Sequence, residues 1–125
     1  MSREVTPAQY RAMETEASVE ERVTAWLQER GYRVHPLVTE VERGYRGKSR
    51  RNPPYTPDLI AVRVWCTGLT KAFYLELKRA NGGKHSTGQL AMAEKLRNER
   101  FQVFQHQSNG VDVIEQLAEF LGVKP

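Results

Sequence analysis

Two short apolar runs joined by a brief polar connection constrain the fold of this chain more than any other feature. The first run covers residues 56–63, the second covers residues 73–79, and the connection contains Gly68. Apolar runs separated in this way are typical of a β-hairpin. If the turn centres near Gly68, Asp58 and Lys78 are equally distant from it and meet at the same end of the antiparallel pair.

The second run alternates in polarity with the period of two that is typical of a strand. One face carries Tyr74, Glu76 and Lys78, and the opposite face carries Phe73, Leu75 and Leu77. We expect the apolar face to pack on the core. Two carboxylates and one ammonium group, those of Asp58, Glu76 and Lys78, are therefore expected to converge at one end of a sheet.

Length and composition limit the classes of protein to which the chain can belong. Its 125 residues suffice for one domain with a hydrophobic core and are too few for two. With 19 Lys and Arg against 15 Asp and Glu, the net charge is +4 and the pI about 9.4, which mildly favours an anionic partner. The single cysteine, Cys66, excludes an internal disulfide framework and fits a reducing compartment. No segment has the apolar length of a membrane span or a signal peptide, so we expect a soluble protein that stays where it is made.

The chain before the hairpin is predicted to be helical from a cap at Thr6 to Gly31, as one helix or as two with a joint near residues 15–18. Apolar residues at helical spacing predict the side that faces the core: Ala12, Val19, Val23, Trp26 and Leu27. Glu16 and Glu20 lie on the same stripe. Either they face a site on the strands, or they lie at the margin of the stripe and reach water.

A basic segment lies between this helix and the hairpin. A strand is predicted over residues 32–38, with Pro36 typical of an edge or a bulge, and residues 42–55 are predicted to form a basic loop. The cations of the loop are Arg43, Arg46, Lys48, Arg50 and Arg51. Cations neutralise phosphates and tyrosine rings stack on bases, so the loop is a candidate nucleic-acid contact. A solvated, flexible loop is the alternative.

The chain after the hairpin is predicted to add two helices and one strand. Ser86 or Thr87 caps a helix with Gln89 in its first turn, residues 101–106 alternate as a strand does, and a final helix begins near residues 109–112. The predicted order is helix, three strands, helix, strand and helix. Because the hairpin is antiparallel and a helical crossover returns the last strand parallel to a neighbour, we expect an α/β fold with a mixed central sheet flanked by helices.

The charged end of the hairpin has the ligand types that a hard divalent cation prefers. Asp58, Glu76 and a further carboxylate offer oxygen ligands to Mg²⁺ or Mn²⁺, and the Leu77 carbonyl can add another. Such an ion polarises a phosphodiester and lowers the pKa of a bound water, which attacks phosphorus in line. Lys78 would hold that water or stabilise the developing charge, and Gln89 would orient the water, the lysine or a phosphate.

Each of these features also has a purely structural interpretation. A Pro-Asp dipeptide is commonly a turn, and Glu-Leu-Lys on a strand is commonly a solvated face with an ion pair. His35, His85 and His106 lack metal-ligand spacing, so we expect solvated or hydrogen-bonded roles for them. Cys66 is expected to be an inert thiol, and both tryptophans are expected to be core residues.

Taken together, Pro57-Asp58 and Glu76-Leu77-Lys78 resemble the signature of the PD-(D/E)XK nuclease superfamily. Within it, the chain resembles the VRR-NUC domain, the virus-type replication and repair nuclease module, from Glu16 onward. The segments that carry this resemblance are residues 56–59, 76–79, 82–84 and 86–89. The resemblance implies a restriction-endonuclease-like core with the order αβββαβα.

The resemblance also implies roles for individual residues. It implies that Asp58 and Glu76 bind a divalent metal, that Lys78 serves catalysis and that Gln89 supports the site. For the helical glutamate of the family it selects Glu16, whereas the similar helix of archaeal-type Holliday junction resolvases selects Glu20. Tyr55 departs from the family, which often has glycine at this position.

We therefore expect a Mg²⁺- or Mn²⁺-dependent endodeoxyribonuclease, acting on branched, flapped or Holliday-junction-like DNA in replication or repair. A nucleic-acid-binding module that keeps the fold without cutting is the alternative, and an RNA-directed nuclease is a third interpretation. A homodimer in the cytoplasm of a bacterial or phage-infected cell is expected. The residues expected to contact DNA are Arg43, Arg46, Lys48, Arg50, Arg51, Arg79 and Lys84.

Overall fold

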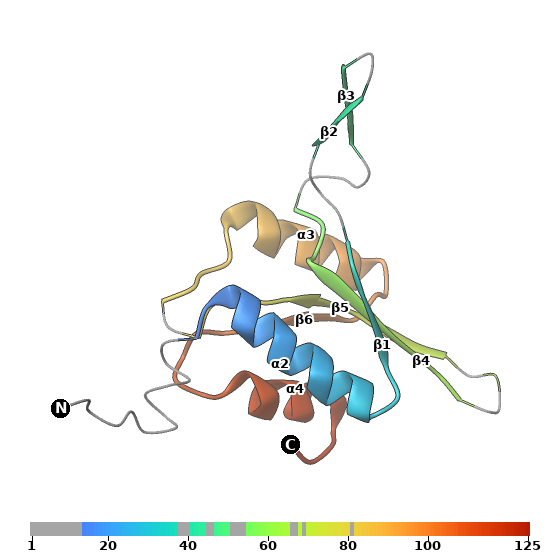
Figure 1. Cartoon of the computed structure of the whole chain (residues 1–125), viewed down its shortest axis with the longest axis vertical. Helices are drawn as coiled ribbons and strands as arrows, with labels where there is room; N and C mark the ends of the chain where they lie inside the picture. Colours follow the sequence, from blue (N-terminus) through green and yellow to red (C-terminus); the bar gives the residue numbers. More distant parts are fainter. Residues whose placement is uncertain are drawn as a thin grey trace.

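The computed structural model describes residues 14–37, 55–65, 68, 70–80 and 82–125, together with the backbone of residues 41–44 and 47–50. The described chain is α/β, as predicted (Figure 1). Its elements are, in order, α2 (Glu16–Glu29), β1 (Arg33–Pro36), β2 (Val41–Gly44), β3 (Gly47–Arg50), β4 (Leu59–Val64), β5 (Thr70–Glu76), α3 (Thr87–Asn98), β6 (Val103–Gln105) and α4 (Val113–Leu121).

The central sheet has four strands in the order β1-β4-β5-β6. β4 pairs antiparallel with both β1 and β5, and β6 pairs parallel with β5 after the chain has crossed over through α3. The predicted hairpin and the predicted parallel return are both confirmed. β1 lies at an edge of this sheet, which agrees with the interpretation of Pro36, because proline cannot donate to a neighbouring strand.

The helices cover both faces of the sheet, with α2 and α4 on one face and α3 on the other (Figure 1). The predicted alternation in β5 places Phe73, Leu75 and Leu77 in the core, each no more than 1% exposed. They pack with the apolar stripe of α2 and with α4 in one cluster. The residues of that stripe that the structure describes, Val19, Val23, Trp26 and Leu27, are all buried, as predicted, and Ala12 lies outside the described residues.

The described helices begin and end at residues with recognisable caps. Thr15 caps α2, and its side-chain oxygen accepts the Ser18 N–H, so α2 begins at the joint predicted near residues 15–18. Ser86 caps α3 as predicted. α4 ends at Gly122, whose φ of +70° is the left-handed conformation that glycine adopts without strain. The helix predicted from Thr6 falls in part on residues 1–13, outside the described residues.

The basic segment contains a second, separate sheet, so the prediction of a loop over residues 42–55 is wrong for this part of it. β2 and β3 pair antiparallel, with Arg43 opposite Lys48 and Gly44 opposite Gly47. We call residues 41–44 and 47–50 the basic arm, and Figure 1 shows it extending away from the body of the molecule. The sequence did not indicate these strands, because charged residues dominate the segment. The two glycines that flank its short connection permit a hairpin whatever the neighbouring side chains are.

The register of the hairpin differs from the predicted one by two residues. Leu59 pairs with Leu75, and continuing this register sets Asp58 opposite Glu76 rather than opposite Lys78. The reason lies in the turn. The Gly68 N–H donates to the Trp65 carbonyl, so the turn is centred before Gly68 and not on it. Among the described residues, no helix has the length and apolar character needed to cross a membrane.

Candidate functional site

Asp58 lies just before β4, at the open end of the hairpin. Its Oδ2 accepts the backbone N–H of Leu77 at 3.3 Å, so the carboxylate is fixed against the strand that carries Glu76. Burial raises the pKa of Asp58 above its usual value, while the Leu77 N–H and then the charges of Lys78 and His85 oppose that rise. The N–H of Leu77 thus has an assigned partner, and a metal-ligand role for its carbonyl stays a prediction.

Glu76 is the last residue of β5 and is only 1% exposed. Burial, and after it the negative charge of Asp58, raise its pKa to about 7. Its Oε2 accepts a long hydrogen bond of 3.5 Å from the Gln105 side chain on β6. Its Oε1 is buried and has no hydrogen-bond partner among the described groups. A buried carboxylate oxygen without a donor, beside a second carboxylate, is costly in a protein interior unless a cation satisfies it.

Lys78 lies two residues after Glu76 and is half-buried. Its charge lowers the pKa values of Glu16, Asp58 and Glu76. The ammonium group therefore lies within electrostatic range of three carboxylates, as the alternation of the strand predicts for Glu76 and Lys78. Its backbone N–H donates to Nδ1 of His106 at 3.3 Å, which fixes the chain at this point.

Gln89 serves α3 and the site at once. Its Oε1 accepts the Ser86 N–H at 2.8 Å, while its backbone N–H donates to the Ser86 hydroxyl, which completes a capping box. The same side chain lies close enough to Glu76 to lower the pKa of that carboxyl group. The predicted proximity of Gln89 to the carboxylates is therefore present. Because the cap holds the oxygen of its amide, the nitrogen is the atom that remains for Glu76.

The structure distinguishes the two candidate glutamates of α2. Glu16 is the first residue of the helix, and its pKa is raised by burial first, then lowered by Lys78 and raised by Asp58. It thus shares the environment of the hairpin carboxylates. Glu20, one turn later, acts on Glu16, and its side chain lines a shallow surface hollow together with Glu21 and Gln28. These interactions favour Glu16 as the helical member of the cluster.

Two histidines for which no site role was predicted connect the parts of the site. His106 is 2% exposed, accepts the Lys78 N–H on its Nδ1 and donates its own backbone N–H to the Glu76 carbonyl at 2.9 Å. Burial lowers its pKa, which keeps the ring neutral. Nε2 of His85 lies 2.6 Å from the His106 carbonyl oxygen. Both histidines are hydrogen-bonded, as expected. Their place in the site could not be predicted from their spacing in the sequence, because the parallel pairing of β5 and β6 creates it.

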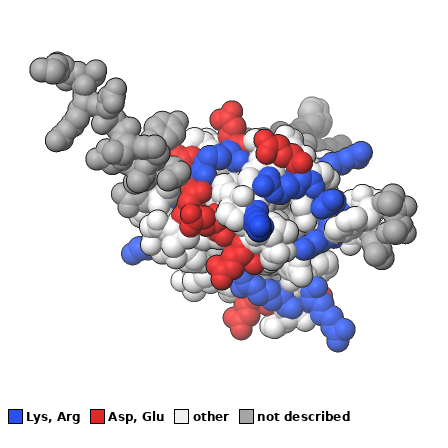
Figure 2. Space-filling model, turned by 90° about the horizontal axis from the view of Figure 1, so that it is seen from below, with Lys and Arg blue, Asp and Glu red and all other residues white. Residues whose placement is uncertain are grey.

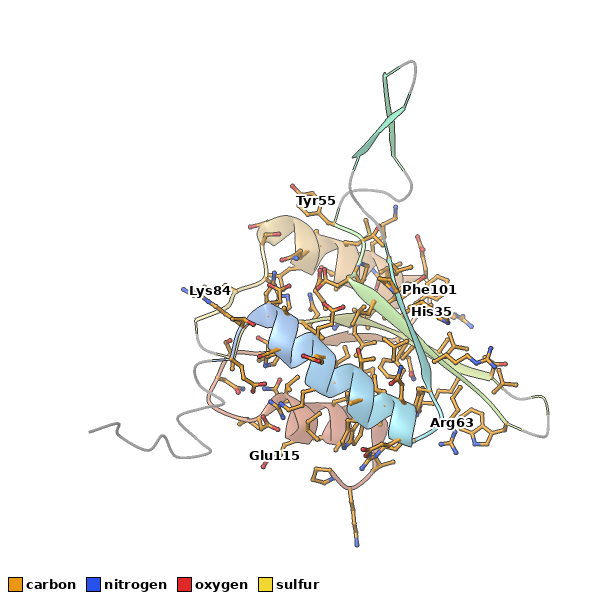
Figure 3. All side chains as sticks on the ribbon, in the orientation of Figure 1. His35, Tyr55, Arg63, Lys84, Phe101 and Glu115 are labelled. Carbon is orange, nitrogen blue, oxygen red and sulfur yellow. The ribbon has the colours of Figure 1, made fainter. Side chains whose placement is uncertain are left out.

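The cations predicted to contact DNA fall into three groups. Arg79 and Lys84 are exposed near the carboxylates in the chain, and Lys84 points outward on the side of the molecule where α3 begins (Figure 3). Three more, Arg43, Lys48 and Arg50, belong to the basic arm, of which the structure describes the backbone alone. Arg46 and Arg51 lie outside the described residues.

Tyr55, three residues before Asp58, has a backbone conformation that is uncommon for tyrosine. Its φ is +64°, in the left-handed region that glycine adopts freely and tyrosine rarely. The ring lies over Gly88 at the beginning of α3, where an added Cβ would come within 2.5 Å of ring atoms, and the residue is 54% exposed (Figure 3). Tyr55 thus has a backbone conformation that is typical of glycine, and its ring covers the first turn of α3.

Some observations bear on whether these residues fit a metal ion. As the side chains stand, no group of three or more His, Cys, Asp or Glu within the described ranges forms a metal site. The unpartnered, buried Oε1 of Glu76 and the hard oxygen donors of Asp58 and Glu16 nevertheless fit a divalent cation. Glu16 is only partly desolvated and remains exposed at the start of its helix, so its side chain can turn toward a bound cation. Binding would therefore draw the carboxylates together.

The cluster combines three acidic groups of raised pKa, one ammonium group and one amide at the open end of a hairpin. Acidic groups that repel one another beside a cationic side chain are suited to hold a metal ion and to act on a phosphate ester. A comparison with protein-family models and with curated proteins gives no match for this chain.

Proposed function

We propose that this protein is a Mg²⁺- or Mn²⁺-dependent endonuclease that hydrolyses DNA phosphodiester bonds. The observation that carries the proposal is Glu76, a carboxylate with a buried, unpartnered oxygen that stands opposite Asp58 in the continued register of the hairpin, with Lys78 two residues further along. The α/β fold with its mixed sheet is compatible with a core of the PD-(D/E)XK type. The resemblance of the motifs to VRR-NUC domains supports the same reaction.

The residues of the site divide the work of hydrolysis among them. Asp58, Glu76 and Glu16 would hold the cation, which would supply Lewis-acid polarisation of the phosphate and a lowered pKa for the attacking water. Lys78 would donate hydrogen bonds to a non-bridging phosphate oxygen and stabilise the charge that develops there. Gln89 would orient Glu76 through its amide nitrogen. Water would attack phosphorus and lose a proton to solvent, the opposite P–O bond would break, and the leaving alkoxide would take up a proton from solvent.

DNA is the proposed polymer because cations accompany the carboxylates in the chain. Arg79 and Lys84 follow the site residues of β5 in the chain and are exposed, and the basic arm supplies further cations. By contrast, the face of the molecule seen in Figure 2 carries both acidic and basic side chains. That face therefore lacks the electrostatic field of one sign that attracts a polyanion. Branched, flapped or Holliday-junction-like DNA in the cytoplasm of a bacterial or phage-infected cell is the proposed setting.

A homodimer is part of the proposal. One small body offers little surface for two DNA arms, and the outer strands β1 and β6 of the central sheet present edges to which a second copy can add. Gel filtration with light scattering should give twice the monomer mass, with or without DNA. A monomer under both conditions would contradict the dimer without touching the nuclease.

Cleavage assays on matched variants test the reaction. Wild type should cut plasmid or synthetic junctions in Mg²⁺ or Mn²⁺ and leave them intact in EDTA. Asp58→Ala, Glu76→Gln and Lys78→Ala should each lower the rate at least about 100-fold, as expected for groups that touch the metal or the reacting phosphate. Glu115→Gln and Lys95→Ala, which change exposed residues of α4 and α3, are the matched controls and should keep the wild-type rate.

The same panel separates the proposal from its competitors. Equal DNA binding by all variants, with no cleavage under any condition, would support a non-catalytic nucleic-acid-binding module instead. Cleavage of RNA oligonucleotides in preference to DNA of the same sequence would move the activity to RNA. Cleavage that persists in Asp58→Ala or in EDTA would overturn the proposed site.

A further inference from the structure

His85 has one ring nitrogen whose state follows from geometry. The residue lies between β5 and α3, directly before the cap Ser86, and its Nε2 is 2.6 Å from the backbone carbonyl oxygen of His106. A carbonyl oxygen only accepts hydrogen bonds, so Nε2 carries the proton. In the neutral ring the lone pair therefore lies on Nδ1.

The Nδ1 atom of His85 is buried and has no hydrogen-bond partner among the described groups. It shares this property with Oε1 of Glu76. His85 also acts electrostatically on Asp58 and Glu16, so its ring belongs to the neighbourhood of the same carboxylates. With the ring neutral, both atoms are buried acceptors without donors, and a cation satisfies such acceptors whereas further acceptors do not.

The anchor of the His85 ring lies just after β6, the strand that pairs with β5, and β5 carries Glu76. The carbonyl that accepts from His85 belongs to His106, which is itself bonded to the backbone of Glu76 and Lys78. Histidines that ligate metals commonly donate the other ring N–H to a backbone carbonyl, because this fixes both the tautomer and the ring orientation. His85 has this arrangement already.

We propose that His85 Nδ1 is a direct ligand of the divalent cation, together with Asp58 and Glu76. The inference deepens the proposed function and rests on it, because it concerns the same site. Imidazole nitrogen is a poor ligand for Mg²⁺ and a good one for Mn²⁺ and later transition metals. The site therefore selects Mn²⁺ over Mg²⁺ through this one residue, while the carboxylates bind both ions.

Pulsed EPR on the Mn²⁺-loaded protein tests the bond directly. Wild type should give the nitrogen coupling of a coordinated imidazole, and full-length protein grown with ¹⁵N-histidine should give the corresponding ¹⁵N coupling. The coupling should disappear in His85→Ala and persist in His35→Ala, the matched control on the edge strand β1. The isotope measurement needs no substitution, so it stands even if His85→Ala fails to fold.

Calorimetric titration gives the second readout. His85→Ala should lower the affinity for Mn²⁺ about 10- to 100-fold, the range found when the environment of a ligated metal is damaged, and should change the affinity for Mg²⁺ less than about threefold. Mn²⁺ bound without nitrogen coupling, or equal losses for both ions, would overturn the role of His85 and leave the nuclease standing. Wild type that binds neither ion would overturn the proposed function as well.

Discussion

At the scale of single residues, Glu76 determines how the site responds to pH. Its carboxyl group is buried, and its pKa is raised to about 7 by that burial and by Asp58. The charged form is therefore unfavourable in the metal-free protein and becomes favourable when a cation is bound. The fold thus buries an acidic group whose charged form is unfavourable, at the position where the proposed reaction needs that charge.

Glu76 should make the metal-free protein less stable as the pH rises. Between the usual glutamate pKa of 4.5 and about 7, folded Glu76 keeps its proton while the unfolded chain has lost it. The free energy of unfolding should therefore fall across this window, by up to about 3 kcal/mol, and stay low above it. Urea unfolding in EDTA from pH 4.5 to 8 measures the effect.

Glu76→Gln is the control for this experiment. His106 acts in the opposite direction, because burial lowers its pKa and the folded state prefers the neutral ring. That contribution is common to both proteins and cancels when the two stability curves are subtracted. A difference between wild type and Glu76→Gln that does not change with pH would contradict the raised pKa.

Gly83 should tolerate a methyl group poorly. A Cβ there would lie 2.7 Å from the Lys78 Cβ and 3.0 Å from the Arg79 carbonyl oxygen, and neither atom can move without the backbone. Gly83→Ala should therefore lower the free energy of unfolding by about 1–3 kcal/mol, and it should slow cleavage because Lys78 is displaced. Chemical denaturation and the junction assay give the two values.

Gly88→Ala is the matched substitution. The neighbour that its Cβ meets is the half-exposed ring of Tyr55, which can swing away, and alanine is the better helix former. Its stability should stay within about 0.5 kcal/mol of wild type. If Gly88→Ala costs as much as Gly83→Ala, the ring of Tyr55 is held more firmly than its exposure indicates.

The sequence alone predicted that Asp58, Glu76 and Lys78 lie at one end of the hairpin, because period-two alternation and a bounded turn are local signals. It could not supply the register, since a turn that closes at Trp65 and Gly68 differs from one centred on Gly68 by a backbone hydrogen bond that composition does not reveal. The role of His85 and His106 depends on the parallel β5–β6 pairing. Contacts that join distant segments leave no periodic pattern.

At the scale of elements, an arginine joins α2 to α4. Arg22 donates to both oxygens of Glu14, at 3.1 and 2.7 Å, and to both oxygens of Asp112, at 2.9 and 2.6 Å. Asp112 also caps α4 by accepting the Ile114 N–H. The side chain of Glu14 is only 4% exposed, and those of Asp112 and Arg22 are 18% and 32% exposed, so this partly buried network fixes the start of α4 against α2.

Arg22→Gln should lower the free energy of unfolding by about 1–3 kcal/mol, because the buried carboxylate of Glu14 loses its partner. The double change Glu14→Gln with Arg22→Gln should recover part of this loss. Glu29→Gln removes the exposed pair with Arg30, 3.7 Å long, and should cost less than about 0.5 kcal/mol. Urea unfolding of the four proteins measures these values, and equal losses for the two pairs would contradict the distinction.

Helices were predicted better than the basic arm for a physical reason. The stripe of α2 and the Ser86 cap are written in residue types at fixed spacing. The strands of the basic arm, which form a separate two-stranded sheet, have no apolar alternation in their sequence to mark them. The charged residues of this segment therefore predict a loop where two short strands form.

At the scale of the whole molecule, the basic arm and the body are expected to do separate tasks. The body contains the core and the candidate site, and the arm is a two-stranded sheet of its own that extends away from it (Figure 1). Changes in the arm should therefore affect attraction to DNA and leave folding almost unchanged.

Replacing Arg43, Lys48 and Arg50 by serine should lower the slope of log affinity against log salt by up to about 3, roughly one unit for each phosphate that the arm no longer neutralises. The melting temperature should stay within about 2 °C of wild type. Fluorescence anisotropy with labelled duplex in EDTA over a salt series measures the slope. Serine at Lys71, Lys95 and Lys124 makes the same change in net charge on the body, and an equal effect there would show that charge alone matters.

The hairpin register has a consequence for how diverged relatives of this chain would look. Asp58 lies opposite Glu76 because of the register in which β4 and β5 pair. This pairing does not depend on the number of residues in the connection after Val64. Evolution can lengthen that connection at small entropic cost, whereas one residue inserted within a strand would turn every later side chain to the other face. Homologues should therefore vary in the interval between Pro-Asp and Glu-x-Lys while both motifs stay intact, and a search with an elastic gap would find them.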